Sequence, residues 1–342
     1  MTAVQFFGFL VAAFAGLSMG SAAWSFKSIR KLPFENWLFT SVTTTLVIVP
    51  WLTLFLYYPH PLSVIQAVGL PILIKANLFA FAWGFANVFC AIGFLRIGVA
   101  LTNGVLGGLG ILVGVTVPMV FKATGIFRHA KDLNSPAGLI ILGGALVMLL
   151  GVALSAVAGK AREGKLPTSG MARFWSAFLI VALGGVLSAG LTFTFAYSQG
   201  PVTDAMQAQR PGAMPATLAV WAIGTLAGAV VNWAYAVSLM VKNGTLLAFL
   251  PAWRELSIPF LGGCQCCLAI VLYAQGSLML GVMGASVGWG VYQGMQILGG
   301  QLVGFATGEW RGANPGPRRM MVLALGVLIG AALIMAYGNS RA

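Results

Sequence analysis

The chain has 342 residues, of which 59% are hydrophobic and only 7% are charged. This composition excludes a soluble globular domain and predicts a protein that crosses a membrane many times. The formal net charge is +13, but the basic residues are scattered over short loops instead of forming one stripe, which argues against nucleic-acid binding.

The predicted elements are membrane-spanning helices. A span needs about 20 mostly apolar residues, because a helix rises about 1.5 Å per residue and the hydrocarbon core is about 30 Å thick. Segments of this kind predict an all-α polytopic membrane protein with ten transmembrane helices. In chain order, the predicted spans cover residues 5–25, 37–58, 76–95, 98–121, 136–159, 174–198, 215–241, 259–280, 282–307 and 319–338.

Charge in the loops predicts the orientation. The loops that follow odd-numbered spans carry most of the 19 Lys and Arg residues. Since positively charged loops stay in the cytoplasm, both termini are expected outside, in a multi-pass protein of the bacterial cytoplasmic (inner) membrane. The chain opens with M-T-A-V-Q-F-F-G-F-L, which lacks the basic region of a signal peptide, so the first apolar segment is expected to be a retained span.

Cysteine and histidine usage offers little for metal binding or catalysis. The four cysteines are Cys90, Cys264, Cys266 and Cys267, all inside predicted spans, and the two histidines are His60 and His129, both in loops. We interpret the cysteines as packing residues. The C-x-C-C run could also bind a soft metal, but helical spacing points Cys264 and Cys266 to different sides. Without a hydrolase or metalloprotease motif, we expect no enzyme, no metal and no cofactor.

The sequence repeats itself. Residues 178–195 align with residues 9–26 at an offset of 169, which places Gly185 on Gly16. The glycine-rich fourth and ninth spans align at an offset of about 183, with Gly281 on Gly98. Five spans per copy is an odd number, so the second copy is inverted. We therefore predict two inverted five-helix repeats, residues 1–165 and 166–342, with a substrate site near the bilayer midplane at the repeat interface.

Carboxylates are rare, and two of the six acidic residues are related by the first offset: Glu35 falls on Asp204. One interpretation is that each carboxylate begins the next helix and complements its dipole. The other is that they mark the two mouths of a pathway and exchange a coupling proton. Glu255 is expected to pair locally with Arg254.

Amides and aromatic rings take the place of charge in the spans. Amides bind hydroxyl groups and rings cover the apolar face of a sugar, so this pattern favours a neutral polyhydroxylated solute. The same residue types also join helices or anchor them at the interface. Trp289, Gln293 and Gln296 share one helical face, which favours a lining role. The predicted substrate-binding residues are Trp83, Asn87, Asn103, Tyr273, Gln275, Trp289 and Gln293, and the predicted proton-coupling residues are Glu35 and Asp204.

Short landmarks follow one another in a fixed order. They are W-G-F-A-N at Trp83–Asn87, L-R-I-G-V-A-L-T-N-G from Leu95, L-S-A-G-L-T-F at Leu187–Phe193, G-A-V-V-N at Gly228–Asn232, and L-Y-A-Q-G followed by G-E-W and P-x-R-R. In this series the chain resembles the bacterial L-rhamnose-proton symporters, a ten-span branch of the drug/metabolite transporter superfamily. The resemblance implies a carrier that takes up a deoxy-sugar with a proton. The matched positions are Trp83, Asn87, Arg96, Asn103, Tyr273 and Trp289.

We therefore predict a secondary active transporter that imports a small neutral sugar, L-rhamnose or a related sugar, by proton symport with alternating access. The G-A-S-V-G stretch before Trp289 is less polar than expected of a rhamnose carrier, which leaves the sugar open. Two other classes stay open: a carrier or exporter of an amine, nucleoside or amino acid, and a membrane sensor or scaffold. The expected partners are the sugar, the proton and the lipid bilayer, and glycine-rich helix faces permit a homodimer without requiring one.

Overall fold

The computed structural model describes residues 2–97, 99–120, 133–163, 171–281, 288–308 and 310–340. Within these ranges the regular elements are helices and there is no strand, which confirms the all-helical class. Seven helices are long and apolar enough to cross a membrane, and a bent helix pair is an eighth candidate.

Each predicted span falls on one to three consecutive helices, although the predicted ninth span begins at residues 282–287, outside those described. The elements are α1 (Ala3–Ser21), α2 (Trp24–Ser28), α3 (Phe34–Thr43), the π-helix η1 (Thr44–Ile48), α4 (Val49–Tyr57), α5 (Ser63–Val68), α6 (Leu70–Arg96), α7 (Val99–Val120), α8 (Pro136–Glu163), α9 (Met171–Ser188), α10 (Gly190–Gln209), α11 (Ala213–Gly224), α12 (Leu226–Asn243), the 3₁₀-helices η3 (Leu246–Phe249) and η4 (Trp253–Leu256), α13 (Ser257–Leu280), α14 (Trp289–Ala306) and α15 (Pro315–Ser340).

The chain forms two compact units. Unit 1 comprises Met1–Gly20, Ala86–Ala189 and Leu272–Ala342, and unit 2 comprises Ser21–Phe85 and Gly190–Val271. Each unit therefore takes segments from both halves of the sequence. The predicted repeats, 1–165 and 166–342, therefore do not coincide with the two compact units. The prediction describes two related stretches of sequence, and it stays a prediction.

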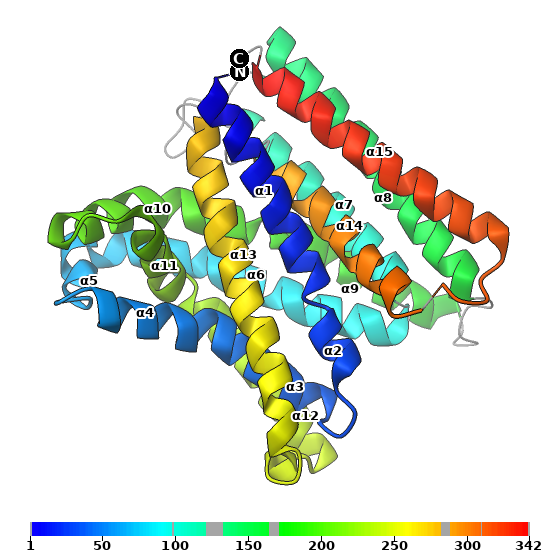
Figure 1. Cartoon of the computed structure of the whole chain (residues 1–342), viewed down its shortest axis with the longest axis horizontal. Helices are drawn as coiled ribbons and strands as arrows, with labels where there is room; N and C mark the ends of the chain where they lie inside the picture. The colour runs from blue at the N-terminus through cyan, green and yellow to red at the C-terminus, as the bar shows by residue number, and fades with distance from the viewer. Residues whose placement is uncertain are drawn as a thin grey trace. The chain divides into compact units, whose positions relative to one another are not determined.

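In unit 1, α8 and α15 run antiparallel along most of their length (Figure 1). Glycines set their spacing. A Cβ atom at Gly144 would meet Met335, one at Gly151 would meet Leu328, and one at Gly338 would meet Ile141. Small residues at such contacts let helix backbones approach closely, which is the main source of helix association in a bilayer. Helix α7 packs against α8, α9 and α14.

Two other close helix contacts of unit 1 each have a counterpart elsewhere in the unit, between residues that the sequence offsets relate. A Cβ at Gly16 would meet the carbonyl oxygen of Tyr292, and a Cβ at Gly185 would lie 2.7 Å from Cβ of Leu109. Gly185 follows Gly16 by 169 positions and Tyr292 follows Leu109 by 183. These are the two offsets of the predicted sequence repeat, so α1 meets α14 and α9 meets α7 at residues that the offsets relate.

The second repeated contact joins the first and third helices of the two copies. A Cβ at Gly276 would lie 2.8 Å from the backbone nitrogen of Ala12, and a Cβ at Gly93 would lie 2.5 Å from Cγ2 of Val181. Val181 follows Ala12 by 169 positions and Gly276 follows Gly93 by 183. Both contacts thus recur at the same pair of offsets.

Unit 2 contains a broken span. Helices α11 and α12 meet at Thr225 with a bend of 53°. At such a break, the last carbonyl groups of one helix and the first N–H groups of the next have no partner within a helix. At this break, one side chain supplies both a donor for a carbonyl group and an acceptor for an N–H group. The amide Nδ2 of Asn77 donates to the Ile223 carbonyl at 2.9 Å, and its Oδ1 accepts from the Ala227 N–H at 3.0 Å.

The second predicted span is also irregular, because the π-helix η1 interrupts it between α3 and α4. Wider π turns leave backbone groups available to partners outside the helix. Here the carbonyl of Thr45 accepts the indole N–H of Trp221 at 3.2 Å, and the Thr45 hydroxyl donates to the Gly263 carbonyl at 3.0 Å. The π turn is thus tied to both α11 and α13.

Candidate functional site

Three predicted substrate-binding residues come together in unit 1. Trp289 and Gln293 lie one turn apart on α14, and the ring centroid of Tyr273 on α13 lies 5.8 Å from that of Trp289. Tyr292 joins them, with its centroid 4.7 Å from Tyr273 and 5.7 Å from Trp289. All four side chains are buried. We call these four residues the aromatic–amide cluster.

Helix α7 holds the cluster in place. The indole Nε1 of Trp289 donates to the Gly110 carbonyl at 3.1 Å, and a Cβ at Gly110 would lie 3.4 Å from Nε2 of Gln293. A Cβ at Gly114 would meet the indole ring itself. The glycines of α7 therefore make room for the tryptophan and leave a carbonyl for it, beyond the close helix packing expected of them.

The cluster has the chemistry of a site for a neutral polar solute. Its three rings present apolar faces, and Gln293 adds an amide whose donors and acceptor suit hydroxyl groups. It contains no charged side chain, which suits a neutral solute better than an ion.

Other predicted residues of unit 1 are less well placed. Gln275 on α13 is half-buried, but it follows Tyr273 by two residues and so points to a different side of the helix. Asn87 on α6 is also half-buried. Asn103 lies on α7, and its side chain falls outside the described structure.

Trp83 belongs to unit 2. Its ring centroid lies 5.8 Å from that of Trp221, which in turn stacks on Phe195 at 5.4 Å. Trp221 is fully buried. This second aromatic group surrounds the π turn and the broken span, and the prediction that Trp83 shares a site with the cluster of unit 1 stays untested.

Glu35 lies in the first turn of α3, as expected of a residue that complements the helix dipole. It is only 6% exposed. Its Oε1 accepts hydrogen bonds from the Thr245 hydroxyl at 2.6 Å and from Nδ2 of Asn243 at 3.1 Å. The carboxylate thus joins the start of α3 to the end of α12 through two neutral donors.

Asp204 does not occupy the corresponding place. It is exposed and lies near the C-terminal end of α10, so the interpretation that it begins the next helix is wrong. The reason is a longer helix in the second copy. At the offset of 169, the end of α2 at Ser28 corresponds to residue 197, whereas α10 continues to Gln209. The added residues contain Asp204, and they match most of the rise of the offset from 169 to about 183.

We expected Glu255 to pair with Arg254, its neighbour in the sequence, and this prediction is wrong. Oε2 of Glu255 accepts hydrogen bonds from three consecutive backbone N–H groups in the range Arg30–Leu32, at 2.9 to 3.1 Å. The Arg254 guanidinium instead lies over the Trp253 ring, 5.4 Å from its centroid. Unpaired backbone N–H groups in a row form a concave anion site, and this loop uses it for a carboxylate of its own chain.

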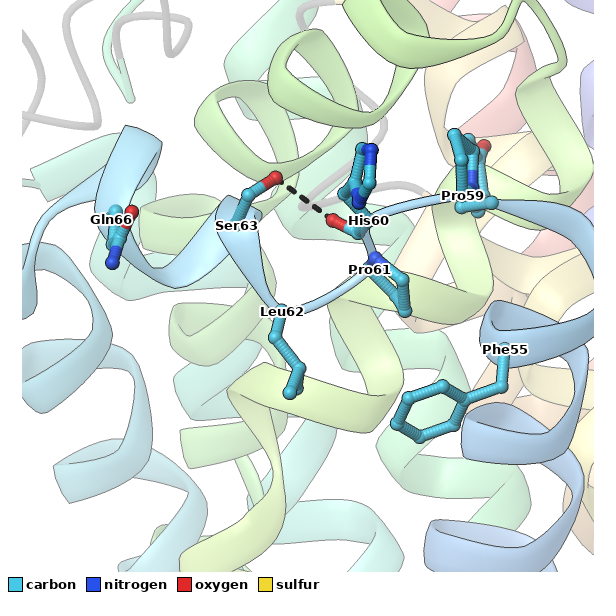
Figure 2. A pocket seen from close by; sticks show the side chains of 8 residues that line it. Phe55, Pro59, His60, Pro61, Leu62, Ser63 and Gln66 are labelled. Atoms are coloured by element: carbon cyan, nitrogen blue, oxygen red, sulfur yellow. Dashed lines mark hydrogen bonds between the residues drawn. The ribbon is translucent and has the colours of Figure 1, made fainter.

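A surface cavity of about 500 Å³ lies at the loop between α4 and α5. Figure 2 shows its wall of Phe55, Leu62 and two prolines, and the hydrogen bond from the Ser63 hydroxyl to the His60 carbonyl at 2.8 Å. Tyr58 also lines it. Burial raises the pKa of the Tyr58 hydroxyl, and the neighbouring Tyr57 adds to the rise while Arg210 opposes it. None of the predicted site residues borders this cavity.

Metal and redox chemistry find no site in the described ranges. No group of three or more His, Cys, Asp or Glu side chains gathers there. The four cysteines are free thiols; Cys267 is buried and the other three are half-buried.

Sequence reasoning missed several residues that the structure singles out. Tyr292 was among the polar residues of the spans, but only its contacts place it in the cluster. Asn77 and Trp221 serve two helix breaks, which are bordered by Gly224 and Pro50, but nothing in the sequence linked these distant side chains to the breaks. Gln265 accepts from the Trp24 indole at 2.7 Å and donates to the Ser21 hydroxyl at 2.9 Å; a glutamine inside an apolar run was the available signal.

Comparison with known proteins adds the family. Residues 2–341 match the family model described as L-rhamnose-proton symport protein. A protein of Shigella boydii serotype 18 named L-rhamnose-proton symporter is 27% identical over 328 residues, covering 92% of this chain and 93% of that protein. A protein of the same name from Escherichia coli O17:K52:H18 is 26% identical over the same coverage. The chain therefore belongs to the L-rhamnose-proton symport protein family.

Proposed function

We propose that this chain is a secondary active transporter that imports a small neutral sugar, L-rhamnose or a related deoxy-sugar, together with a proton. The observation that carries the proposal is the aromatic–amide cluster: three rings and one amide, buried and uncharged, in a helical protein of this family. Rings cover the C–H face of a pyranose, and the amide orients its hydroxyl groups.

Alternating access between two inverted repeats of five spans supplies the transport cycle. Ten spans follow if α7, α14 and the α11/α12 pair cross the membrane beside the seven long helices. The duplication is supported by the contacts of Gly16 and Gly185, and by those of Ala12 and Val181, which recur at the sequence offsets. The unit boundaries support it too: those after Gly20 and Ala189 are 169 positions apart.

The coupling proton is carried by Glu35 or Asp204. Glu35 is buried and held by neutral donors, whereas Asp204 is exposed near the end of α10. Ionisable residues in membrane proteins of this type commonly mark ion pathways. Both termini lie outside in this proposal, and the functional unit is a monomer or a homodimer.

The test is uptake into liposomes. Purified protein is reconstituted, and accumulation of radiolabelled L-rhamnose is followed with and without a proton gradient directed inward. We expect accumulation that depends on the gradient in the wild type, and its loss in Glu35→Gln or in Asp204→Asn. A glutamine at position 35 still accepts both hydrogen bonds through its carbonyl oxygen, so a loss there reports the charge and not the fold.

Glu255→Gln is the matched control, because that carboxylate serves backbone N–H groups and should leave coupling intact. Uptake that ignores the gradient would contradict proton symport. Absence of any L-rhamnose uptake would overturn the sugar assignment and favour a carrier of amines, nucleosides or amino acids, which a thermal-shift screen of those compounds would identify.

A further inference from the structure

Helix α10 carries four side chains with a buried polar atom that lacks a hydrogen-bond partner in the described part of the chain. One is Oε1 of Gln209, at the last residue of the helix, and the other three lie further inside it. They are Oγ1 of Thr192, Nε2 of Gln199 and Oγ1 of Thr203. Thr192 is only 2% exposed. Their spacing of seven and four residues places all three on one face of the helix, because about 3.6 residues complete a turn. We call this face the α10 polar face.

A proline interrupts the same stretch. Pro201 lies inside α10 and has no backbone N–H, so the carbonyl of Tyr197, four residues earlier, receives no helical hydrogen bond from it. Pro201 therefore leaves one backbone acceptor without its helical partner, on the side of α10 opposite to Gln199 and Thr203.

The hydroxyl groups elsewhere on α10 do have partners. The Thr194 hydroxyl donates to the Ala76 carbonyl on α6 at 2.9 Å, and the Ser198 hydroxyl donates to the Thr194 carbonyl at 2.7 Å. Apart from Gln209 at the end of the helix, the unpaired atoms of α10 in the described structure thus lie on one face. Buried polar groups are almost always hydrogen-bonded in folded proteins, so several unpaired groups on one face need an explanation.

We propose that the α10 polar face is a second binding surface for the hydroxyl groups of the transported sugar, separate from the aromatic–amide cluster. This inference rests on the proposed function. Gln199 offers two N–H donors, and each threonine hydroxyl both donates and accepts, which matches a neutral polyol and not an ion. Gln199 and Thr203 are one turn, about 6 Å, apart along the axis, so one pyranose ring reaches both.

Stability and affinity respond oppositely at such a surface. Replacing an unpaired buried group by an apolar one of similar shape is neutral or stabilising for the protein without ligand, while a ligand loses a hydrogen bond. We expect Gln199→Leu and Thr203→Val to leave the thermal unfolding temperature of the sugar-free protein unchanged or higher. Each should weaken L-rhamnose binding, measured by calorimetry in detergent, by about tenfold.

The matched control is Thr194→Val on the same helix, which should lower the unfolding temperature and leave the affinity unchanged, because that hydroxyl is bonded to the protein. Thr203→Ser keeps the hydroxyl and should keep the affinity. If the wild type binds L-rhamnose and the Gln199→Leu and Thr203→Val variants bind it with the same affinity, the α10 polar face alone is overturned. Variants that lose as much stability as Thr194→Val would overturn it too. A wild type that binds no sugar would overturn the proposed function itself, and this inference with it.

Discussion

Asn77→Leu tests how the broken span is held. The variant keeps the shape of the side chain and removes the donor to the Ile223 carbonyl and the acceptor of the Ala227 N–H. Side-chain hydrogen bonds between membrane helices contribute about 0.6 kcal/mol on average. Leaving a buried backbone group unpaired costs about 1–3 kcal/mol more. With two such groups at the break, we expect a loss of about 2–6 kcal/mol in the free energy of unfolding.

The assay is reversible unfolding by sodium dodecyl sulfate in mixed micelles, with hydrogen exchange at the Ala227 amide as a local readout. Asn232→Leu is the matched control. Its Nδ2 bonds only to the Gly228 carbonyl of its own helix, at 2.8 Å, so it should cost less than about 1 kcal/mol. Equal losses in the two variants, or unchanged exchange at Ala227 in Asn77→Leu, would refute the role assigned to Asn77.

Three further predictions concern packing, a loop and a buried hydroxyl. Gly16→Ala places a Cβ against a backbone carbonyl and should cost about 1–3 kcal/mol of stability. Its control is Gly143→Ala, where a Cβ has nothing within 4 Å, and this variant should be neutral or gain up to about 1 kcal/mol. Equal effects of the two variants on unfolding in micelles would contradict the packing. Glu255→Ala frees the backbone of Arg30–Leu32 and should speed tryptic cleavage there, and an unchanged cleavage rate would show that other contacts hold the loop. Because burial raises the pKa of Tyr58, the unfolded chain releases that proton first and stability should fall as pH rises above about 10; Tyr58→Phe should remove that part of the fall, and identical pH profiles would argue against it.

Helix positions followed from the sequence because apolar length is a strong constraint in a bilayer. The places where helices break did not. The π turn at Thr44–Ile48 and the bend at Thr225 depend on partners from other helices, such as Trp221 and Asn77, that satisfy the freed backbone groups. Gly224 and Pro50 border the breaks, but α10 continues through Pro201, so such residues alone do not predict where a helix breaks.

The candidate site was partly predictable, because the spacing of residues on one helix can be read from the sequence. Trp289 and Gln293 share a helical face by spacing alone, so their grouping could be expected, and Tyr273 joins them in the structure. Glu255 was assigned to a neighbour in sequence, although its partners lie more than 220 positions away. Asp204 was misplaced because a constant offset cannot reveal a helix that is longer in one copy.

The pairing of α8 with α15 has a consequence for how the protein is made. Leu328 packs against the Gly151 position, yet it is synthesised 177 residues later. At about 5–20 residues per second, the ribosome needs roughly 9–35 s to deliver it. During that interval the glycine-lined face of α8 lacks the partner that α15 provides, so unit 1 is completed only after α15 has been made. Chains that stop before residue 315 should therefore be the preferred substrates of membrane proteases.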